Sequence, residues 1–215
     1  MNIDSTIQRI SVSCINNISL VPYAACLGNL PLRIQYLSWL NDIDNLKLIA
    51  SPALLAKNKP LSFVEESFVR FSKPASTGFF IYYRPHNTFI GTTKLDSYDH
   101  TTNSAFDGIL IGDRNYHGMG LSKLTYTILL SFAFNHLKLT QVNGGCNDLN
   151  YAMKRTYHSL GYSETRRTAN TDCIDGCLSD HVYYSITRDH FLSTFTGQCQ
   201  LDVNYSNQQC HPHEK

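Results

Sequence analysis

Residues 112–120 have the sequence Gly-Asp-Arg-Asn-Tyr-His-Gly-Met-Gly and lie between a short apolar run and a long amphipathic segment. The run before them, Gly108–Ile111, is apolar and β-branched, which predicts a buried strand. After them, apolar residues recur at helical spacing from Leu121 to Phe132, which predicts a helix. Where a strand passes through a glycine loop into a helix, unpaired N–H groups and the helix dipole favour an anion. The sequence therefore predicts a phosphate-binding loop.

Two common phosphate-binding patterns do not fit this loop. The pattern G-x-x-x-x-G-K-[ST] is absent from the chain, which disfavours a nucleoside triphosphatase. A dinucleotide pattern G-x-G-x-x-G starting at Gly118 has Lys123 in its third glycine position. No acidic residue follows at the spacing that ribose recognition uses. The ligand of the loop is therefore sought in another class.

Two motifs resemble those of the GNAT N-acetyltransferases. Residues 115–120, Asn-Tyr-His-Gly-Met-Gly, resemble the pyrophosphate loop written [QR]-x-x-G-x-[GA], although Asn115 departs at the first position and Arg114 stands beside it. Asn150-x-x-Met153-x-x-x-Tyr157-x-x-x-Gly161-Tyr162 resembles the signature N-x-x-S-x-x-x-Y-x-x-x-G-F. Met153 replaces a small residue there, which changes the expected shape of the pocket.

Further segments resemble this family in the same order along residues 15–190. Tyr36–Asp42 resembles its first helix, Phe89–Thr92 its third strand and Asp180–Ile186 its closing strand. The Ile-Gly-Asp-Arg sequence that ends at Arg114 is similar to the branch typified by ribosomal-protein-alanine acetyltransferases. The resemblance implies an α/β (α+β) fold with a mixed, mostly antiparallel sheet of about seven strands. It also implies splayed central strands and helices on both faces.

The resemblance implies that acetyl-CoA is the cosubstrate. Its pantetheine arm would lie beside the central strand as an extra strand, and backbone N–H groups of the loop would hold its pyrophosphate. Asn150 would hydrogen-bond the pantetheine or the helix beside it. The expected donor-binding residues are Ile109, Leu110, Ile111, Arg114, Asn115, Tyr116, His117, Gly118, Met119, Gly120, Leu121, Asn150 and Met153.

The implied activity is an N-acetyltransferase that moves the acetyl group directly to a primary amine, without a covalent intermediate. Tyr157 matches the family tyrosine that protonates the departing thiolate, a transfer that a phenol of pKa about 10 supports when it is coupled to bond breaking. An amino sugar and a protein N-terminal amine are the favoured acceptors. The alternative is a catalytically inactive acyl-CoA-binding module that acts as a sensor or interaction partner.

Asp107 is the candidate for the general base. It falls one position away from the usual acidic place, which Phe106 occupies, and strand alternation would aim it at the other face. The alternative for Asp107 is a solvated carboxylate at a strand end. No base is assigned from the sequence.

Length and charge set the remaining expectations. A chain of 215 residues suits one domain, expected at 15–191, with a loose leader at 1–14 and a polar, flexible tail at 192–215. Net charge is +1 without a Lys/Arg cluster, which disfavours nucleic acid. No apolar stretch reaches the roughly 18 residues of a membrane span, and no signal peptide is visible, so we expect a cytoplasmic protein. The oligomeric state is left open, with a homodimer as one option.

The seven cysteines raise the question of a metal. Cys173-x-x-x-Cys177-x-x-x-His181 lacks the C-x-x-C spacing of common zinc sites, and we expect free thiols and no metal. Cys146 has no His/Asp partner pattern in the sequence and is expected to pack rather than to react. His117 is likewise expected to pack.

The expected elements follow from periodicity, turns and caps. Helices are expected at 31–40, 46–50, 120–136 and 150–160, with Gly161 as a C-cap and a capping box at Ser62-x-x-Glu65. Strands are expected at 15–21, 79–83, 89–95, around Ile109, and at 141–143, 163–167 and 181–187.

Overall fold

The computed structural model describes residues 6–49, 58–73, 75–174, 177–195 and 200–206. Its strands are β1 (Ile7–Val12), β2 (Ile18–Pro22), β3 (Thr77–Tyr83), β4 (Thr88–Asp99), β5 (Ser104–Ile111), β6 (Gln141–Asn147), β7 (Ser163–Ile174), β8 (Cys177–Thr187) and β9 (Leu201–Tyr205). In the described residues these nine strands form one sheet in the order β7-β8-β6-β5-β4-β3-β2-β1-β9. Neighbouring strands are antiparallel except β5 and β6, which are parallel. The expected mixed, mostly antiparallel sheet is confirmed, with more strands than the seven expected.

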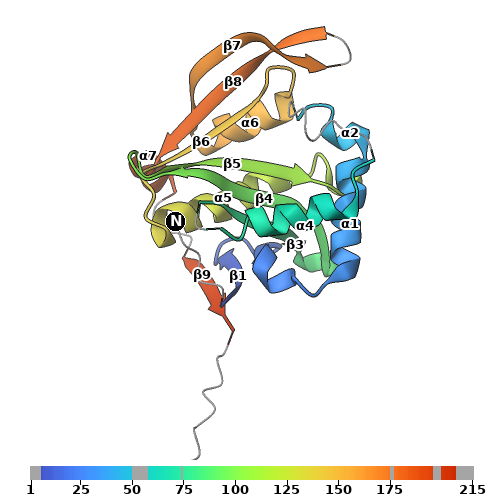
Figure 1. The fold of residues 1–215 in the computed structure, drawn as a ribbon. Helices are drawn as coiled ribbons and strands as arrows, with labels where there is room; N and C mark the ends of the chain where they lie inside the picture. The colour runs from blue at the N-terminus through green and yellow to red at the C-terminus, as the bar shows by residue number, and fades with distance from the viewer. Residues whose placement is uncertain (1–5, 50–57, 74, 175–176, 196–199, 207–215) are drawn as a thin grey trace, which may run out of the picture.

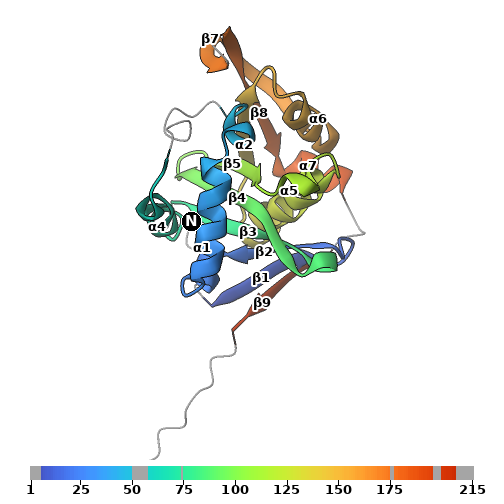
Figure 2. The same cartoon turned by 90° about the vertical axis from the view of Figure 1, so that its right-hand side faces the viewer.

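Helices cover both faces of this sheet (Figures 1 and 2). The helices are α1 (Leu30–Asn41), α2 (Ile43–Leu46), α4 (Leu61–Arg70), α5 (Leu121–Ser131), α6 (Tyr151–Leu160) and α7 (Arg188–Thr194), with short 3-10 turns at Tyr23–Cys26, Arg84–His86 and Arg114–Tyr116. Helices α1 and α4 cover one face over a core that includes Trp39, Phe68 and Phe80. Helices α5 and α6 cover the other face over a core that includes Phe79 and Leu129. This layering holds the middle strands between two apolar layers.

The helix nearest the candidate site begins and ends where its sequence predicts. Asn150 is the N-cap of α6, and its side-chain oxygen accepts a hydrogen bond from the N–H of Met153. Gly161 ends the helix in the left-handed region, with φ of 86°. These caps fix the position of Tyr157 along the helix. Helix α5 also forms as expected and continues through a π-helical turn at Phe132–His136.

The leader and the tail are more ordered than expected. Residues 7–12 form β1, which buries Ile7, Ile10 and Val12, and residues 201–205 form β9, which pairs antiparallel with β1. Helix α7 carries the chain to Thr194, past the expected end of the domain. The expectation of a loose leader is therefore wrong for residues 7–12. The expectation of a flexible tail is wrong for residues 201–205, because β9 completes an edge that β1 leaves open.

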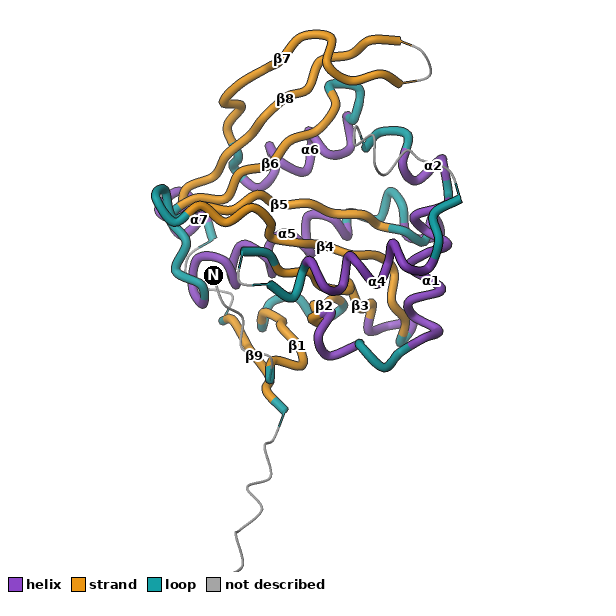
Figure 3. The backbone as a smooth tube through the Cα atoms, in the orientation of Figure 1, coloured by secondary structure: helices purple, strands orange, loops and turns teal. Residues whose placement is uncertain are grey.

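Two expectations about local structure are also wrong. Helix α4 begins at Leu61 with Pro60 as its N-cap, so Ser62 and Glu65 do not form a capping box. The last two strands are much longer than expected, and the expected loop between them is a β-hairpin that extends beyond the body of the molecule (Figures 1 and 3). Most of β7 is exposed, so its sequence lacks the apolar alternation that marks a strand.

In the described ranges, no helix is both long enough and apolar enough to cross a membrane.

Candidate active site

The two parallel strands at the middle of the sheet separate part of the way along. Strands β5 and β6 pair only at Ser104–Gln141, Ala105–Val142 and Phe106–Asn143. Beyond these positions β5 keeps its partner β4, β6 keeps its partner β8, and the two fan apart (Figure 1). The expected splay is present. It leaves main-chain N–H and C=O groups of both strands facing each other without a strand between them.

A cavity of about 420 Å³ lies at this splay. Of the residues singled out from sequence, Asp107, Ile109, Leu110, Asn150, Met153 and Tyr157 line it together. Ile111 packs against the apolar core, and residues 112–120 follow at the end of β5. Helices α1 and α4 contribute Tyr36, Leu40, Phe63, Ser67 and Arg70 to the same cavity.

The glycine loop turns β5 into α5 with its backbone exposed. Gly118 and Gly120 have φ of 75° and 72°, and nothing lies within 4 Å of where a Cβ would stand at either position. Gly120 is the N-cap of α5 and gives no side-chain hydrogen bond to the first turn. The backbone at residues 117–120 is therefore exposed, and the first turn of α5 has no side-chain cap to satisfy its amides, as an anion site requires.

Three side chains of the loop form ion pairs or hydrogen bonds with other parts of the protein. Arg114 forms ion pairs with Asp42 and Asp44 beside α2. Tyr116 is buried and its hydroxyl lies 2.7 Å from Nδ1 of His86. His117 is exposed, with its Nε2 2.7 Å from the carbonyl oxygen of Ile111. The loop thus presents main-chain groups outward, with Met119 half exposed among them.

Asp107 is buried among three tyrosines. Its Oδ1 accepts hydrogen bonds from the hydroxyls of Tyr157 at 2.8 Å and Tyr126 at 3.0 Å, and its Oδ2 accepts one from Tyr162 at 2.6 Å. Burial raises the pKa of the Asp107 carboxyl to about 6, although the three donors act to lower it. With an exposure of 8 %, Asp107 is not the solvated strand-end carboxylate that was one expectation. It faces the layer of α5 and α6.

Tyr157 lies beside this carboxylate in the lining of the cavity. Its ring stacks on Tyr184 with centroids 4.8 Å apart, and burial and the Asp107 charge raise the pKa of its phenol well above the ordinary value. A Cβ at Gly144 of β6 would stand 2.3 Å from the Tyr157 hydroxyl. The hydroxyl therefore reaches the strand only because residue 144 has no side chain.

A second polar cluster meets the same cavity from β7 and β8. Nδ1 of His181 lies 2.9 Å from Oδ2 of Asp172, and the side-chain N–H of Asn147 donates to that oxygen at 3.1 Å. Asn147 accepts in turn from Ser179 at 3.0 Å and from the N–H of Leu149 at 2.8 Å. His181 and Asn147 line the cavity. The sequence pointed to His181 only through its spacing from two cysteines and gave no signal for Asp172.

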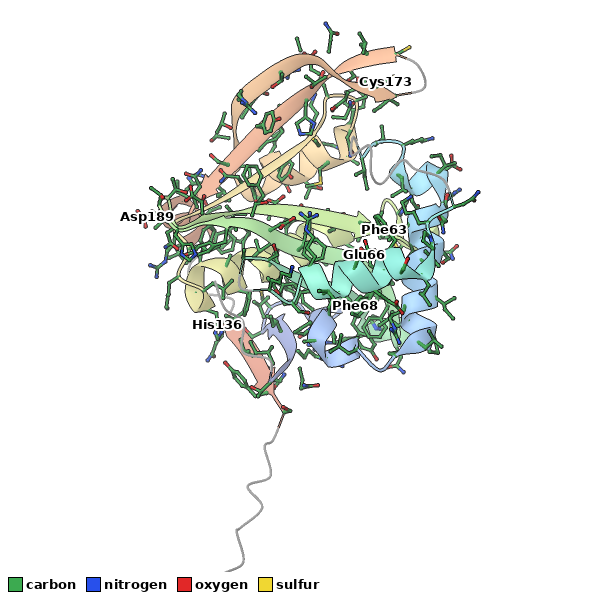
Figure 4. All side chains as sticks on the ribbon, viewed as in Figure 1. Phe63, Glu66, Phe68, His136, Cys173 and Asp189 are labelled. Atoms are coloured by element: carbon green, nitrogen blue, oxygen red, sulfur yellow. The ribbon has the colours of Figure 1, made fainter. Side chains whose placement is uncertain are left out.

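Five of the seven cysteines lie in the described residues. Burial raises the pKa of the Cys146 thiol to about 12, which keeps it protonated. Cys26, Cys146, Cys173 and Cys177 are free, whereas Cys14 is disulfide-bonded and departs from the expectation of free thiols. Cys173 lies near the tip of the β7–β8 hairpin (Figure 4). Among the residues with described positions, no three His, Cys, Asp or Glu side chains are grouped to hold a metal ion.

Comparison with known proteins identifies the fold. No protein-family model matches the chain, and no curated protein matches its sequence. Among solved structures, the chain is similar to a spermidine N-acetyltransferase from Vibrio cholerae in complex with CoA and spermine. The TM-score is 0.68 at 16% sequence identity, and the alignment covers 88% of this chain and 99% of that one. It is also similar to a GNAT-family acetyltransferase from Bacillus anthracis, with a TM-score of 0.66, 13% identity and coverage of 84% and 99%. The chain therefore has the GNAT acetyltransferase fold.

Proposed function

We propose that this protein is an acetyl-CoA-dependent N-acetyltransferase that moves the acetyl group directly to a primary amine. The observation that carries the proposal is the exposed glycine loop at the end of β5. This loop comes directly after the part of β5 that separates from β6 and lines the cavity. A diphosphate attached to a long flexible arm fits this arrangement: the amides of Gly118–Leu121 hold the anion, and the facing edges of β5 and β6 hold the arm.

Tyr157 is the proposed general acid. Its hydroxyl stands at the splay beside Gly144, where the thiolate leaves, and its raised pKa keeps the proton on the phenol until the sulfur takes it. Asp107 holds the Tyr157 oxygen in place by accepting its hydrogen until the thiolate forms. It is not the general base in this proposal, because both of its oxygens already accept hydrogen bonds and it faces the α5 and α6 layer. A third tyrosine hydroxyl, from Tyr162, holds the second oxygen.

The acceptor is proposed to be a monoamine, either an amino sugar or a protein N-terminal amine. A polyamine needs several carboxylates, but among the described residues that line the cavity Asp107 alone is acidic, and three hydroxyls surround it. Arg70 and Lys94 line the same cavity and share the buried carboxylate of Asp96. Both cations share one carboxylate, and Asp107 is enclosed by tyrosine hydroxyls, so the described lining holds no carboxylate that is open to pair with a second ammonium group. The spermine complex is thus a property of the Vibrio cholerae enzyme that we do not extend to this chain.

Similarity to the ribosomal-protein-alanine acetyltransferase branch, the cytoplasmic location and a homodimer remain predictions from the sequence.

The proposal is tested by acetyl-CoA binding and thiol release. Isothermal titration calorimetry is expected to detect binding, and Gly120→Asn to weaken it at least about tenfold, because a side chain there occupies the space in which charge-assisted amide contacts form. Asparagine tolerates the left-handed region, so the loss reports on space and not on backbone strain.

Gly161→Asn is the control for backbone conformation, since Gly161 also has a positive φ but ends α6 outside the loop. A Cβ there meets the exposed His190 ring, at 2.6 Å from Nε2, and that ring can turn aside. This variant is expected to bind acetyl-CoA as the parent does. Thiol release is then measured with glucosamine, an alanine-initiated peptide and spermidine. Binding without release on any amine supports the inactive acyl-CoA-binding module instead. The absence of binding overturns both readings.

A further inference from the structure

We propose that His181 is the general base of this reaction and that Asp172 is its positioning residue. The inference rests on the proposed function, because a base is needed only if an amine is acetylated. It does not come from any motif in the sequence. It comes from where β7 and β8 bring these two side chains relative to the cavity and to Tyr157.

Asp172 and Asn147 orient the imidazole ring of His181. Oδ2 of Asp172 accepts from Nδ2 of Asn147 at 3.1 Å and lies 2.9 Å from Nδ1 of His181. A carboxylate oxygen only accepts, so Nδ1 carries the hydrogen and Nε2 keeps its lone pair. Asp172 is buried and Asn147 fully so, which leaves the pair little freedom to reorient. The imidazole is thereby held in the tautomer that a base requires.

Nε2 of His181 lies at the cavity. A Cβ at Gly145 would stand 2.6 Å from Nε2 of His181, so the imidazole lies directly against the backbone of β6. His181 lines the same cavity as Tyr157, and its side chain is 24 % exposed. The free nitrogen therefore sits at the splay with access from the cavity.

Tyr157 and His181 lie on opposite faces of the sheet. Residues 144 and 145 of β6 point to opposite faces, and β8 follows the same alternation, with Tyr184 stacked on Tyr157. Tyr157 therefore meets β6 at Gly144 from the α6 side, and His181 meets it at Gly145 from the other side. An acid and a base lie on opposite sides of the place where the pantetheine arm is proposed to pass.

The strand irregularity in β7 makes this possible. The pairing of β7 with β8 shifts between Thr168 and Asp172, and Asn170 within the shift has φ of 55°. Thr168 is opposite His181, whereas Asp172 is opposite Ser179. The extra residues carry the Asp172 side chain back toward His181, a use of a bulge that re-aims a side chain beside a site.

The proton steps balance with these two residues. As the amine nitrogen bonds to the carbonyl carbon, its N–H proton passes to Nε2 of His181. As the carbon–sulfur bond breaks, the hydroxyl hydrogen of Tyr157 turns from Oδ1 of Asp107 to the sulfur, which takes the proton. His181 then releases its proton to solvent and Tyr157 regains one, so the products are the amide and the free thiol.

The tautomer is tested without turnover. Two-dimensional 15N NMR of the full-length protein with acetyl-CoA is expected to find the neutral His181 ring protonated at Nδ1, and Asp172→Asn to reduce this preference. A neutral His181 ring protonated at Nε2 overturns the proposal, because no lone pair then faces the cavity.

Kinetics test the role. With the panel amine that turns over best, His181→Gln is expected to lower kcat about 100-fold or more and Asp172→Asn about tenfold, with the affinity for acetyl-CoA within about twofold of the parent. His190→Gln on α7, away from the cavity, is the control and is expected to match the parent.

The two proposals fail differently. A parent that releases thiol on an amine while His181→Gln retains kcat within about threefold overturns the base and leaves the acetyltransferase in place. A parent that binds acetyl-CoA but acetylates no amine overturns the acetyltransferase and the base together.

Discussion

At the scale of single residues, the site depends on two glycines at positions where a side chain would not fit. Gly144 and Gly145 are consecutive in β6, and a Cβ at either would strike the Tyr157 hydroxyl or the His181 ring. A one-residue alternation thus gives one glycine to each face of the strand. The sequence alone presents them as two glycines in a strand, a pattern that more often marks a bend or a bulge.

Tyr157→Phe removes the proposed proton donor and one hydrogen bond to Asp107. We expect kcat to fall about 100-fold, because general acid catalysis typically contributes on that order, and the acetyl-CoA affinity to stay within about twofold. Steady-state kinetics and calorimetry on the same preparations measure the two quantities.

Tyr162→Phe is the control for this variant. It removes another hydroxyl from Asp107, but Tyr162 does not line the cavity among the described residues. It is expected to lose stability to a similar degree and to keep most of its turnover. Equal losses of kcat in the two variants contradict an acid role for Tyr157 and leave it only a structural one.

Asp107 makes the stability of the protein depend on pH. Its pKa is about 6 in the folded protein against 3.8 for an ordinary Asp, so the folded state holds the proton more tightly. This contribution to the unfolding free energy is present in full below pH 3.8 and is lost as pH rises to about 6, with a size on the order of 3 kcal/mol.

Urea unfolding at several pH values between 4 and 7.5 tests this, with Asp107→Asn as the variant that cannot titrate. The unfolding free energy of the parent minus that of the variant is expected to fall across that range by roughly 2–3 kcal/mol. A difference that stays constant with pH shows that Asp107 titrates as an ordinary carboxyl.

At the scale of elements, those beside the predicted motifs follow from the sequence because local signals fix them. The Asn150 and Gly161 caps set α6, and the glycine loop sets the start of α5. Strands β3 and β4 also form around the strands expected at 79–83 and 89–95, and they pair as a hairpin with a turn at Arg84–His86. Each of these depends on residues close together in the chain.

The elements missed from the sequence depend on partners far along the chain. Strand β9 pairs with β1 nearly 200 residues earlier, and its five residues, Leu-Asp-Val-Asn-Tyr, alternate apolar and polar over too short a run to stand out in a polar tail. Most of β7 is exposed, so that strand lacks an apolar pattern of its own. The Asp107 cluster joins β5, α5, α6 and the residue after Gly161, and the His181 pair depends on a shift in strand register. The spacing of residues along the sequence does not indicate contacts between residues so far apart in the chain.

At the scale of the whole molecule, the sheet divides the proposed chemistry. Helix α6 supplies Tyr157, and the Asp107 side chain of β5 points toward the same layer, into which the glycine loop leads at the start of α5. The α1 and α4 layer supplies apolar and aromatic walls of the cavity such as Tyr36 and Phe63. The donor and the acceptor are therefore proposed to approach the splay from different sides, which favours direct transfer between them.

The charge of the acceptor side leads to the last prediction. Arg70 from α4 and Lys94 from β4 line the cavity and share Asp96, while Asp107 in the same lining is enclosed by three tyrosine hydroxyls. A second ammonium group in the acceptor would lie near these cations, and one such repulsion of about 1.4 kcal/mol lowers kcat/KM tenfold. We therefore expect spermidine to have a kcat/KM at least about tenfold below that of glucosamine or of the alanine-initiated peptide, measured by thiol release at constant ionic strength.

Lys94→Gln separates charge from shape in this comparison. It removes one of the two cations and leaves the Arg70–Asp96 ion pair, so the kcat/KM for spermidine is expected to rise relative to that for glucosamine. Added salt is expected to narrow the difference between these acceptors in the parent, because it screens the same repulsion. If spermidine is the best acceptor of the parent, Arg70 and Lys94 do not select the acceptor, and the monoamine assignment is wrong even though acetyl transfer itself stands.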